Sequence, residues 1–222
     1  MFPGRGNELT QAAWLTEFVS PITHFLGSWL IGCATTNNSR DRKLVTFAGI
    51  MPDLDGLGLI LDVARSLSTG QENTFHSYQQ YHHYLSHGWP GALVVTGFLL
   101  SFARERWRVA LLCLLTFHLH LLCDLIGSRG PTPGDLWPIA YAEPFFRHPV
   151  FFWKGQWQLD GWQNRVICVA LVLTELGLAP RRGYSCVEVF SRRADQVFVS
   201  VLRKWRASWA GGARVGRRQR GE

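Results

Sequence analysis

The sequence predicts an all-α protein, a multi-helix membrane bundle with a metal site between its helices and a basic amphipathic helix at its C-terminal end. Three observations predict this fold. Leu-rich apolar runs of helical length dominate the chain, and Val and Ile seldom alternate with polar residues as they would in strands. Only 18% of the residues are charged, against about 25% in ordinary soluble domains. Histidines and aspartates recur inside the apolar runs, where a polar group without a partner is costly.

Five apolar stretches are the candidate membrane segments. A spanning helix needs about 20 apolar residues, and the two strongest stretches reach that length only with the polar residues at their ends. Gly88 and Pro90 favour a helix start at the beginning of the stretch 88–103, because proline is tolerated in the first turn. A soluble helical protein whose core helices carry these residues is the alternative. The stretches are residues 14–36, 44–61, 88–103, 109–123 and 166–179.

The positive charge of the chain is confined to its C-terminal part. Residues 181–222 contain 11 Lys/Arg and 3 Asp/Glu, whereas residues 1–180 contain 12 and 13. Within residues 184–210 the apolar residues recur at helical spacing, which predicts a basic amphipathic helix suited to an anionic surface. We therefore expect a membrane-embedded domain at 1–180 and a cytoplasmic tail at 181–222, in a multi-pass inner-membrane protein. Membrane lipids are the expected partners; nucleic acid is not expected, because no recognised binding module appears.

Seven residues are candidate metal ligands, and the two among them that lie in PDLDG are also candidate catalytic groups. Imidazole and carboxylate ligands suit zinc, manganese or iron, and the five cysteines form no CxxC pair that would indicate a thiolate site. We expect a divalent cofactor, with zinc as the first choice. The candidate ligands are His24, Asp53, Asp55, His82, His87, His120 and Asp124, and the candidate catalytic groups are Asp53 and Asp55.

The spacing of these residues can be tested against helix geometry. His120 and Asp124 are four apart and share a helix face. His82 and His87 are five apart and do not, so a helix must begin or bend between them if both bind. Asp53 and Asp55 are two apart, and in an extended segment both side chains would point to one side. Measured along the chain, the main candidates lie 10 to 17 residues from the nearest basic turn. At about 1.5 Å per helical residue, this places the candidate ligands about 15–25 Å from the basic turns. If the basic turns all lie on one side of a helix bundle, the candidate ligands lie at a similar depth within it.

The ordered motifs resemble a family of predicted bacterial inner-membrane metal-dependent hydrolases. In this sequence they are THFLG, PDLDG, HHYLSH, HLLCD and LWP, which together cover about residues 20–140. His83 stands where the family usually has arginine, and Ser86 where it has threonine. Since that arginine would be a natural phosphate clamp, its absence weakens the case for an anionic phosphoester. The order of the ligand-type residues is also similar to that of helical zinc-dependent phospholipases C, a similarity that favours a lipid or phosphoester substrate.

These residues predict an enzyme, a membrane-bound metal-dependent hydrolase. A bound metal would activate water toward an ester or phosphoester of a lipid-like substrate. Two alternatives from other classes stay open. The first is a membrane metal- or haem-binding protein for transport or electron transfer. The second is a scaffold in which the buried polar residues only fix helix packing.

Overall fold

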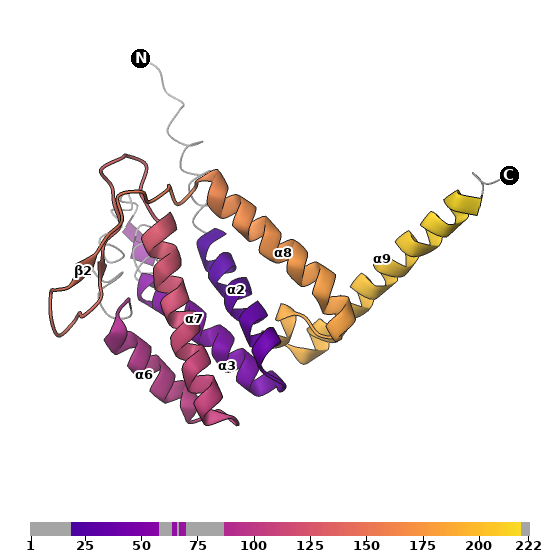
Figure 1. The fold of residues 1–222 in the computed structure, drawn as a ribbon, viewed down its shortest axis with the longest axis horizontal. Coiled ribbons are helices and arrows are strands. Elements are labelled where there is room, and N and C mark those ends of the chain that lie inside the picture. The colour runs from indigo at the N-terminus through magenta and orange to yellow at the C-terminus, as the bar shows by residue number, and fades with distance from the viewer. Residues whose placement is uncertain (1–18, 58–63, 66, 70–86, 219–222) are drawn as a thin grey trace, which may run out of the picture. The chain divides into compact units, whose positions relative to one another are not determined.

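The computed structural model describes residues 19–57, 64–65, 67–69 and 87–218, and only the backbone at residues 19–20, 55–57 and 209–218. The chain is predominantly helical, which confirms the all-α prediction. The single sheet of the described part is a two-stranded antiparallel pair, in which Ile139 lies opposite Phe151. Figure 1 shows the elements α2 (Val19–Thr35), α3 (Ser39–Ile50), η1 (Pro52–Leu57), α6 (Trp89–Leu100), α7 (Arg106–Gly127), β1 (Ile139–Ala140), β2 (Val150–Phe151), α8 (Trp162–Arg182), η2 (Cys186–Val189) and α9 (Arg192–Arg218).

The chain divides into two compact units, residues 1–168 and 169–222. Helix α8 begins in the first unit and ends in the second. The division of the chain into a membrane-embedded domain and a cytoplasmic tail at residue 180 stays a prediction, because compactness does not report which side of a membrane a segment occupies. The first unit carries all the candidate ligands.

The helix boundaries follow local sequence signals. Gly88 is the N-cap of α6, and Pro90 lies in its first turn, as the sequence predicted. The apolar run 109–123 becomes the central part of the longer helix α7. The basic amphipathic helix begins at Arg192, because the 3₁₀ turn η2 occupies the start of the predicted segment 184–210.

The PDLDG segment is not extended, although the argument from the spacing of its two aspartates requires an extended segment. Residues Pro52–Leu57 form the 3₁₀ helix η1, not an extended segment. The turn follows directly on α3, where Pro52 removes a backbone donor and so favours a change of helix type. Because a 3₁₀ helix has three residues per turn, residues two apart in it do not share a side. The argument that paired Asp53 with Asp55 by strand geometry therefore fails.

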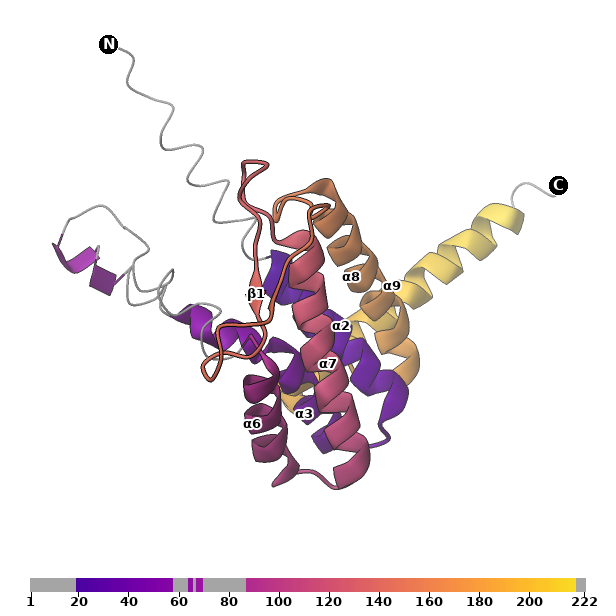
Figure 2. The same ribbon diagram turned by 60° about the vertical axis from the view of Figure 1, so that its left-hand side comes forward.

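Helices α3, α6 and α7 enclose the apolar core of the first unit, and Figure 2 shows them side by side. Thr116 on α7 donates its hydroxyl to the Val45 carbonyl of α3 at 3.1 Å. Helix α2 packs on α3 at an unusually close approach, because a Cβ added at Gly49 would lie 1.8 Å from Ser28 Oγ. Small residues that let helix backbones approach are typical of membrane helix interfaces. The buried core residues are Leu44, Ala48, Ala92, Leu99, Val109, Cys113, Phe117, Leu121 and Ile139.

The outer faces of α6, α7 and α8 carry large apolar side chains that the chain leaves exposed. Among the described residues, α7 is the one helix long and apolar enough to cross a membrane, whereas α6 is apolar but has 12 residues. At helical rise, the 22 residues of α7 span about 33 Å, close to the thickness of a bilayer core of about 30 Å. Exposed apolar patches of this kind mark a surface that contacts a membrane or another protein. They include Leu93, Val94 and Phe98 on α6, Trp107, Leu111, Leu115 and Leu122 on α7, and Trp162, Val166, Val169 and Leu173 on α8.

Two basic turns of the first unit meet at Asp41. Its carboxylate, in the first turn of α3, accepts hydrogen bonds from the backbone N–H groups of Arg104 (2.8 Å) and Glu105 (3.0 Å). It thereby satisfies donors at the start of α7, where the side chain of Glu105 makes no capping bond. Burial by itself raises the pKa of Asp41, but these two N–H groups and the side chain of Asn38 bind the ionised form and bring the pKa below its ordinary value.

We expect the D41N variant to lose about 1–2 kcal/mol of unfolding free energy at pH 7, because the amide removes the charge from these hydrogen bonds. A carboxylate whose pKa is lower in the folded state stabilises the fold above its unfolded pKa of about 3.9. The contribution is lost as the pH falls through the folded pKa. The stability difference between wild type and variant, measured by thermal unfolding in detergent, should therefore shrink below about pH 4. A difference that stays constant down to pH 2 would contradict this role for Asp41.

Candidate metal centre

Five of the predicted ligands converge at one buried place in the first unit. His24 comes from α2, Asp53 from η1, His87 from the residue before the α6 N-cap, and His120 and Asp124 from α7. Within each of two groups of three, the candidate ligand atoms all lie within 4.8 Å of one another. One group is His24, His120 and Asp124, and the other is Asp53, His87 and His120. These five side chains lie close together, and metal binding by them stays a prediction.

His120 is the shared member of both groups and the centre of the arrangement. Its Nδ1 lies 2.8 Å from the Gly49 carbonyl oxygen, to which it must donate, because a carbonyl oxygen only accepts. In the neutral ring this leaves the lone pair on Nε2. That atom faces two carboxylates, at 3.1 Å from Asp124 Oδ2 and 3.4 Å from Asp53 Oδ1. A histidine fixed by a backbone carbonyl on one nitrogen is the usual arrangement of a metal ligand.

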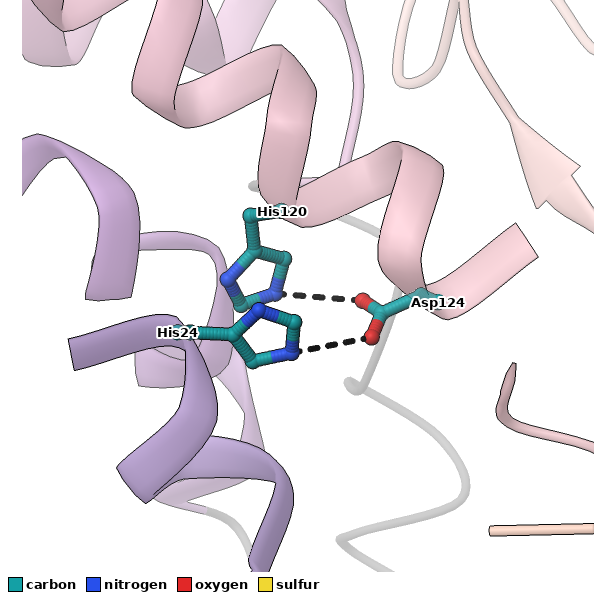
Figure 3. A group of neighbouring side chains, drawn as sticks. All are labelled: His24, His120 and Asp124. Atoms are coloured by element: carbon teal, nitrogen blue, oxygen red, sulfur yellow. Dashed lines mark hydrogen bonds and ion pairs between the residues drawn. The ribbon is translucent and has the colours of Figure 1, made fainter. Parts of the chain in front are cut away.

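Three histidines, which are far apart in the sequence, lie around the Asp124 carboxylate. His24 Nε2 lies 3.2 Å from its Oδ1, and His87 Nε2 lies 3.6 Å from its Oδ2, the oxygen that also faces His120. Figure 3 shows His24 and His120 approaching this carboxylate from one side, with their rings stacked at a centroid distance of 3.7 Å. The carboxylate and the three imidazoles are each at least nine-tenths buried.

The residues present fit a divalent cation. Two buried polar atoms of the site, His120 Nε2 and Asp53 Oδ2, have no hydrogen-bond partner in the described part of the chain. Such atoms are rare in native proteins and call for an explanation, of which a bound ion is one. The carboxylates of Asp53 and Asp124 also bring negative charge to the site, which a divalent cation would balance. The imidazole and carboxylate donors match the preferences of zinc, manganese and iron.

The two groups of donors point to one ion, not two that share a ligand. His120 Nε2 has a single lone pair and can bind one metal, so the groups cannot each hold an ion through it. Zinc in catalytic sites takes three protein ligands and keeps a further position open. Five donor residues are two more than such an ion needs. The remaining two could orient the ligands or take part in the chemistry.

Two predicted ligands are not placed by this geometry, and one other histidine lies elsewhere. His82 lies outside the described residues, and so does the side chain of Asp55. His118, only two positions from His120, faces another part of the first unit, where its Nε2 lies 2.8 Å from the Tyr141 hydroxyl and its Nδ1 contacts the Leu114 carbonyl at 2.7 Å. Residues two apart on a helix point in nearly opposite directions, which explains the separation.

Gln156 supports the C-terminal end of α7 and is not among the residues that the sequence singles out. The amide is buried and links the end of α7 to the LWP loop. Its Nε2 donates to the carbonyls of Asp124 (3.1 Å) and Leu125 (3.0 Å), and its Oε1 accepts from the Trp137 N–H at 2.7 Å. The last carbonyls of a helix need such partners. The side chain therefore fixes the turn that carries Asp124, but a lone glutamine among aromatic residues carries no signal of this role.

The start of α6 is held in a similar way. The Trp89 N–H donates to the Tyr141 carbonyl at 3.0 Å, next to His87. A Cβ at Gly88 would approach that carbonyl oxygen to 2.4 Å, so only glycine allows this contact. The β1 end of the hairpin thereby fixes the backbone that carries His87.

The chain belongs to the YdjM inner membrane protein family, whose model matches residues 19–184. This match spans all five converging residues and confirms the predicted bacterial inner-membrane location. No curated protein and no solved structure matches the chain.

Proposed function

We propose that this protein is a membrane-bound metal-dependent hydrolase that acts on an ester or phosphoester of a lipid-like substrate. The observation that carries the proposal is the orientation of His120. Its Nδ1 is committed to the Gly49 carbonyl, and its Nε2 points without a hydrogen bond at the carboxylates of Asp53 and Asp124. One imidazole nitrogen that faces two carboxylate oxygens at these distances is a donor set that suits a divalent cation.

In this proposal the ligands come from the more buried of the two sets of three residues. His24, His120 and Asp124 would hold zinc, a set of two histidines and one carboxylate that is common in hydrolytic zinc sites. A zinc ion held there would supply a Lewis acid for the substrate oxygen and lower the pKa of water. His87, 3.6 Å from Asp124 Oδ2, would orient the carboxylate or act as a further ligand.

Asp53 is the proposed general base. It has the most exposed side chain of the five, at 27%, so it lies on the side of the site that substrate and water can reach. Its Oδ1 lies 3.4 Å from His120 Nε2, so the carboxylate is beside the proposed metal, where it would accept a proton from the attacking water. The protonated carboxyl can then return the proton to the leaving group.

The stacking of His24 and His120 argues against haem, one of the alternatives. A porphyrin held by both rings would have to lie between them, whereas the two rings are in contact at a centroid distance of 3.7 Å. The two carboxylates within 3.4 Å of His120 Nε2 also favour a small hard cation over an iron porphyrin.

We also propose a multi-pass topology with the basic turns and the tail in the cytoplasm. The exposed apolar faces of α6, α7 and α8 support several membrane contacts, and the basic run Arg104–Arg108 leads into the first turn of α7. Asp124 lies three residues before the end of α7, so the metal site would open toward the periplasmic face. Reporters inserted at Arg106 and fused after Arg218 are expected to give cytoplasmic signals. Periplasmic signals from both positions would reverse the topology.

Activity is tested with the full chain purified in a neutral detergent. Zinc-loaded wild type is offered phosphodiester, phosphomonoester and carboxylic-ester lipids in mixed micelles. We expect hydrolysis of at least one class, loss of activity on chelation and recovery with zinc. The D53N variant should lose about 10²–10⁴-fold in rate while it retains metal, because a general base is removed. The D160N variant changes an exposed aspartate outside the site and serves as the control. Equal rates in wild type and D53N would contradict the role of Asp53, and no chelator-sensitive hydrolysis of any class would contradict the proposed activity.

A further inference from the structure

The second unit, residues 169–222, contains a helical corner between α8 and α9. Gly183 ends α8 with φ +85°, a conformation that favours glycine. Beyond it, the buried Asp195 of α9 accepts hydrogen bonds from the Ser185 N–H (2.7 Å) and hydroxyl (2.5 Å). The buried Glu175 of α8 accepts one from the Cys186 N–H at 2.7 Å. Two carboxylates, one from each helix, thus hold the connection between α8 and α9 in place.

An apolar groove of about 750 Å³ lies between the two helices of this corner. Its walls are open to the surroundings, since Leu173 and Trp205 are 63% and 66% exposed. On α9 the apolar residues of the groove follow the i, i+3, i+4 pattern, so they form one continuous stripe. The main lining residues are Leu173, Leu176 and Pro180 of α8 and Phe198, Val201 and Trp205 of α9.

Two arginines complete the lining of the groove. Arg181, at the end of α8, and Arg206, on α9, both line it. Neither forms an ion pair within the described part of the chain. Arg203, by contrast, donates its Nε to the Pro180 carbonyl at 3.0 Å and so serves the corner itself. The groove therefore combines an open apolar surface with two guanidinium groups available to an anion.

We propose that this groove binds an anionic phospholipid. An acyl chain would lie against the apolar walls, and the headgroup phosphate would pair with Arg181 and Arg206, because guanidinium groups bind phosphate oxygens in pairs. The charge of the region supports an anionic occupant: residues 181–222 carry 11 Lys/Arg and 3 Asp/Glu. Membership of an inner membrane protein family supports a lipid as the occupant, and the family model covers the α8 side of the groove. The proposal is independent of the metal site.

The test uses the delipidated full chain in a neutral detergent, titrated with phosphatidylglycerol or phosphatidylcholine and observed by native mass spectrometry. We expect wild type to bind phosphatidylglycerol more tightly than phosphatidylcholine. The R181Q/R206Q variant should weaken phosphatidylglycerol binding about 25-fold, because each basic residue near an anionic lipid contributes about a factor of five. The R192Q/R193Q variant removes the same charge from two exposed arginines that do not line the groove, and it should bind as wild type does.

Three results would overturn the proposal. Equal losses in the two double variants would assign the effect to the overall charge of α9 and not to the groove. Equal binding of the two lipids by wild type would remove the role of the net negative charge of the headgroup. Tight binding of duplex DNA at 150 mM salt that is lost in R181Q/R206Q, with phosphatidylglycerol binding unchanged, would assign these arginines to nucleic acid instead.

Discussion

Replacing Asp124 by asparagine is expected to lower the zinc affinity of the protein by at least about 100-fold, since even partners outside the ligand shell contribute about 10–100-fold. The carboxylate lies within 3.6 Å of ring nitrogens of His24, His87 and His120, and asparagine removes its charge at nearly constant size. The fold should survive, because the amide oxygen can still accept a hydrogen bond. Metal content at equal folded yield, measured by elemental analysis after dialysis against zinc, reports the result.

The D124A variant separates binding from packing. It removes the metal ligand and also leaves buried histidines without a partner, so we expect loss of zinc together with about 1–3 kcal/mol of unfolding free energy. If the cluster only fixed helix packing, D124N would keep whatever metal the wild type carries, and D124A alone would show a defect. Equal metal content in wild type and both variants would remove Asp124 from the ligand set.

Replacing Gly49 by alanine is expected to cost about 2–3 kcal/mol of unfolding free energy and most of the zinc affinity. The new Cβ would lie 1.8 Å from Ser28 Oγ and 2.6 Å from Ser28 Cβ, so α2 and α3 must separate, and overpacking of this kind costs about 1–3 kcal/mol. The Gly49 carbonyl also holds His120 Nδ1, and its displacement should lower zinc affinity about 10–100-fold.

The chain offers a matched control and a rescue for this prediction. A Cβ at Gly27, on α2, meets nothing within 4 Å, so G27A should be neutral or gain about 0.5–1 kcal/mol from helix propensity. The S28G/G49A variant removes the clashing side chain and should recover part of the stability and most of the zinc binding. Thermal unfolding and zinc titration are measured on all four proteins. Equal stability of G49A and G27A would contradict the close helix approach.

The sequence predicts well which side chains lie close together where this depends on spacing along one helix. His120 and Asp124 share a face because they are four apart, and α6 begins at Gly88 because glycine and proline are strong local signals. The convergence of His24 and His87 on the same carboxylate also follows from counting residues to the basic turns. The residue count depends on the rise per residue of a helix, and this rise hardly varies with context.

Other features depend on contacts that the order of residues does not encode. The PDLDG segment folds as a 3₁₀ turn because it follows directly on α3, and a two-residue spacing has no fixed meaning without the backbone conformation. The Gly49 carbonyl and Gln156 are neutral groups that many residues could supply, so nothing in their identity indicates that they support ligands. Only the packing of α3 and of the LWP loop against α7 assigns those roles.

X-ray absorption at the zinc edge of the zinc-loaded full chain tests the metal centre most directly. We predict one zinc per chain with a first shell of nitrogen and oxygen at about 2.0–2.2 Å and multiple scattering from at least two imidazoles, with that imidazole signal reduced in H120Q. A sulfur shell at about 2.3 Å would instead assign the metal to cysteine. That result, or less than about a tenth of a zinc per folded chain in the loaded protein, would contradict a centre built from His24, His120 and Asp124.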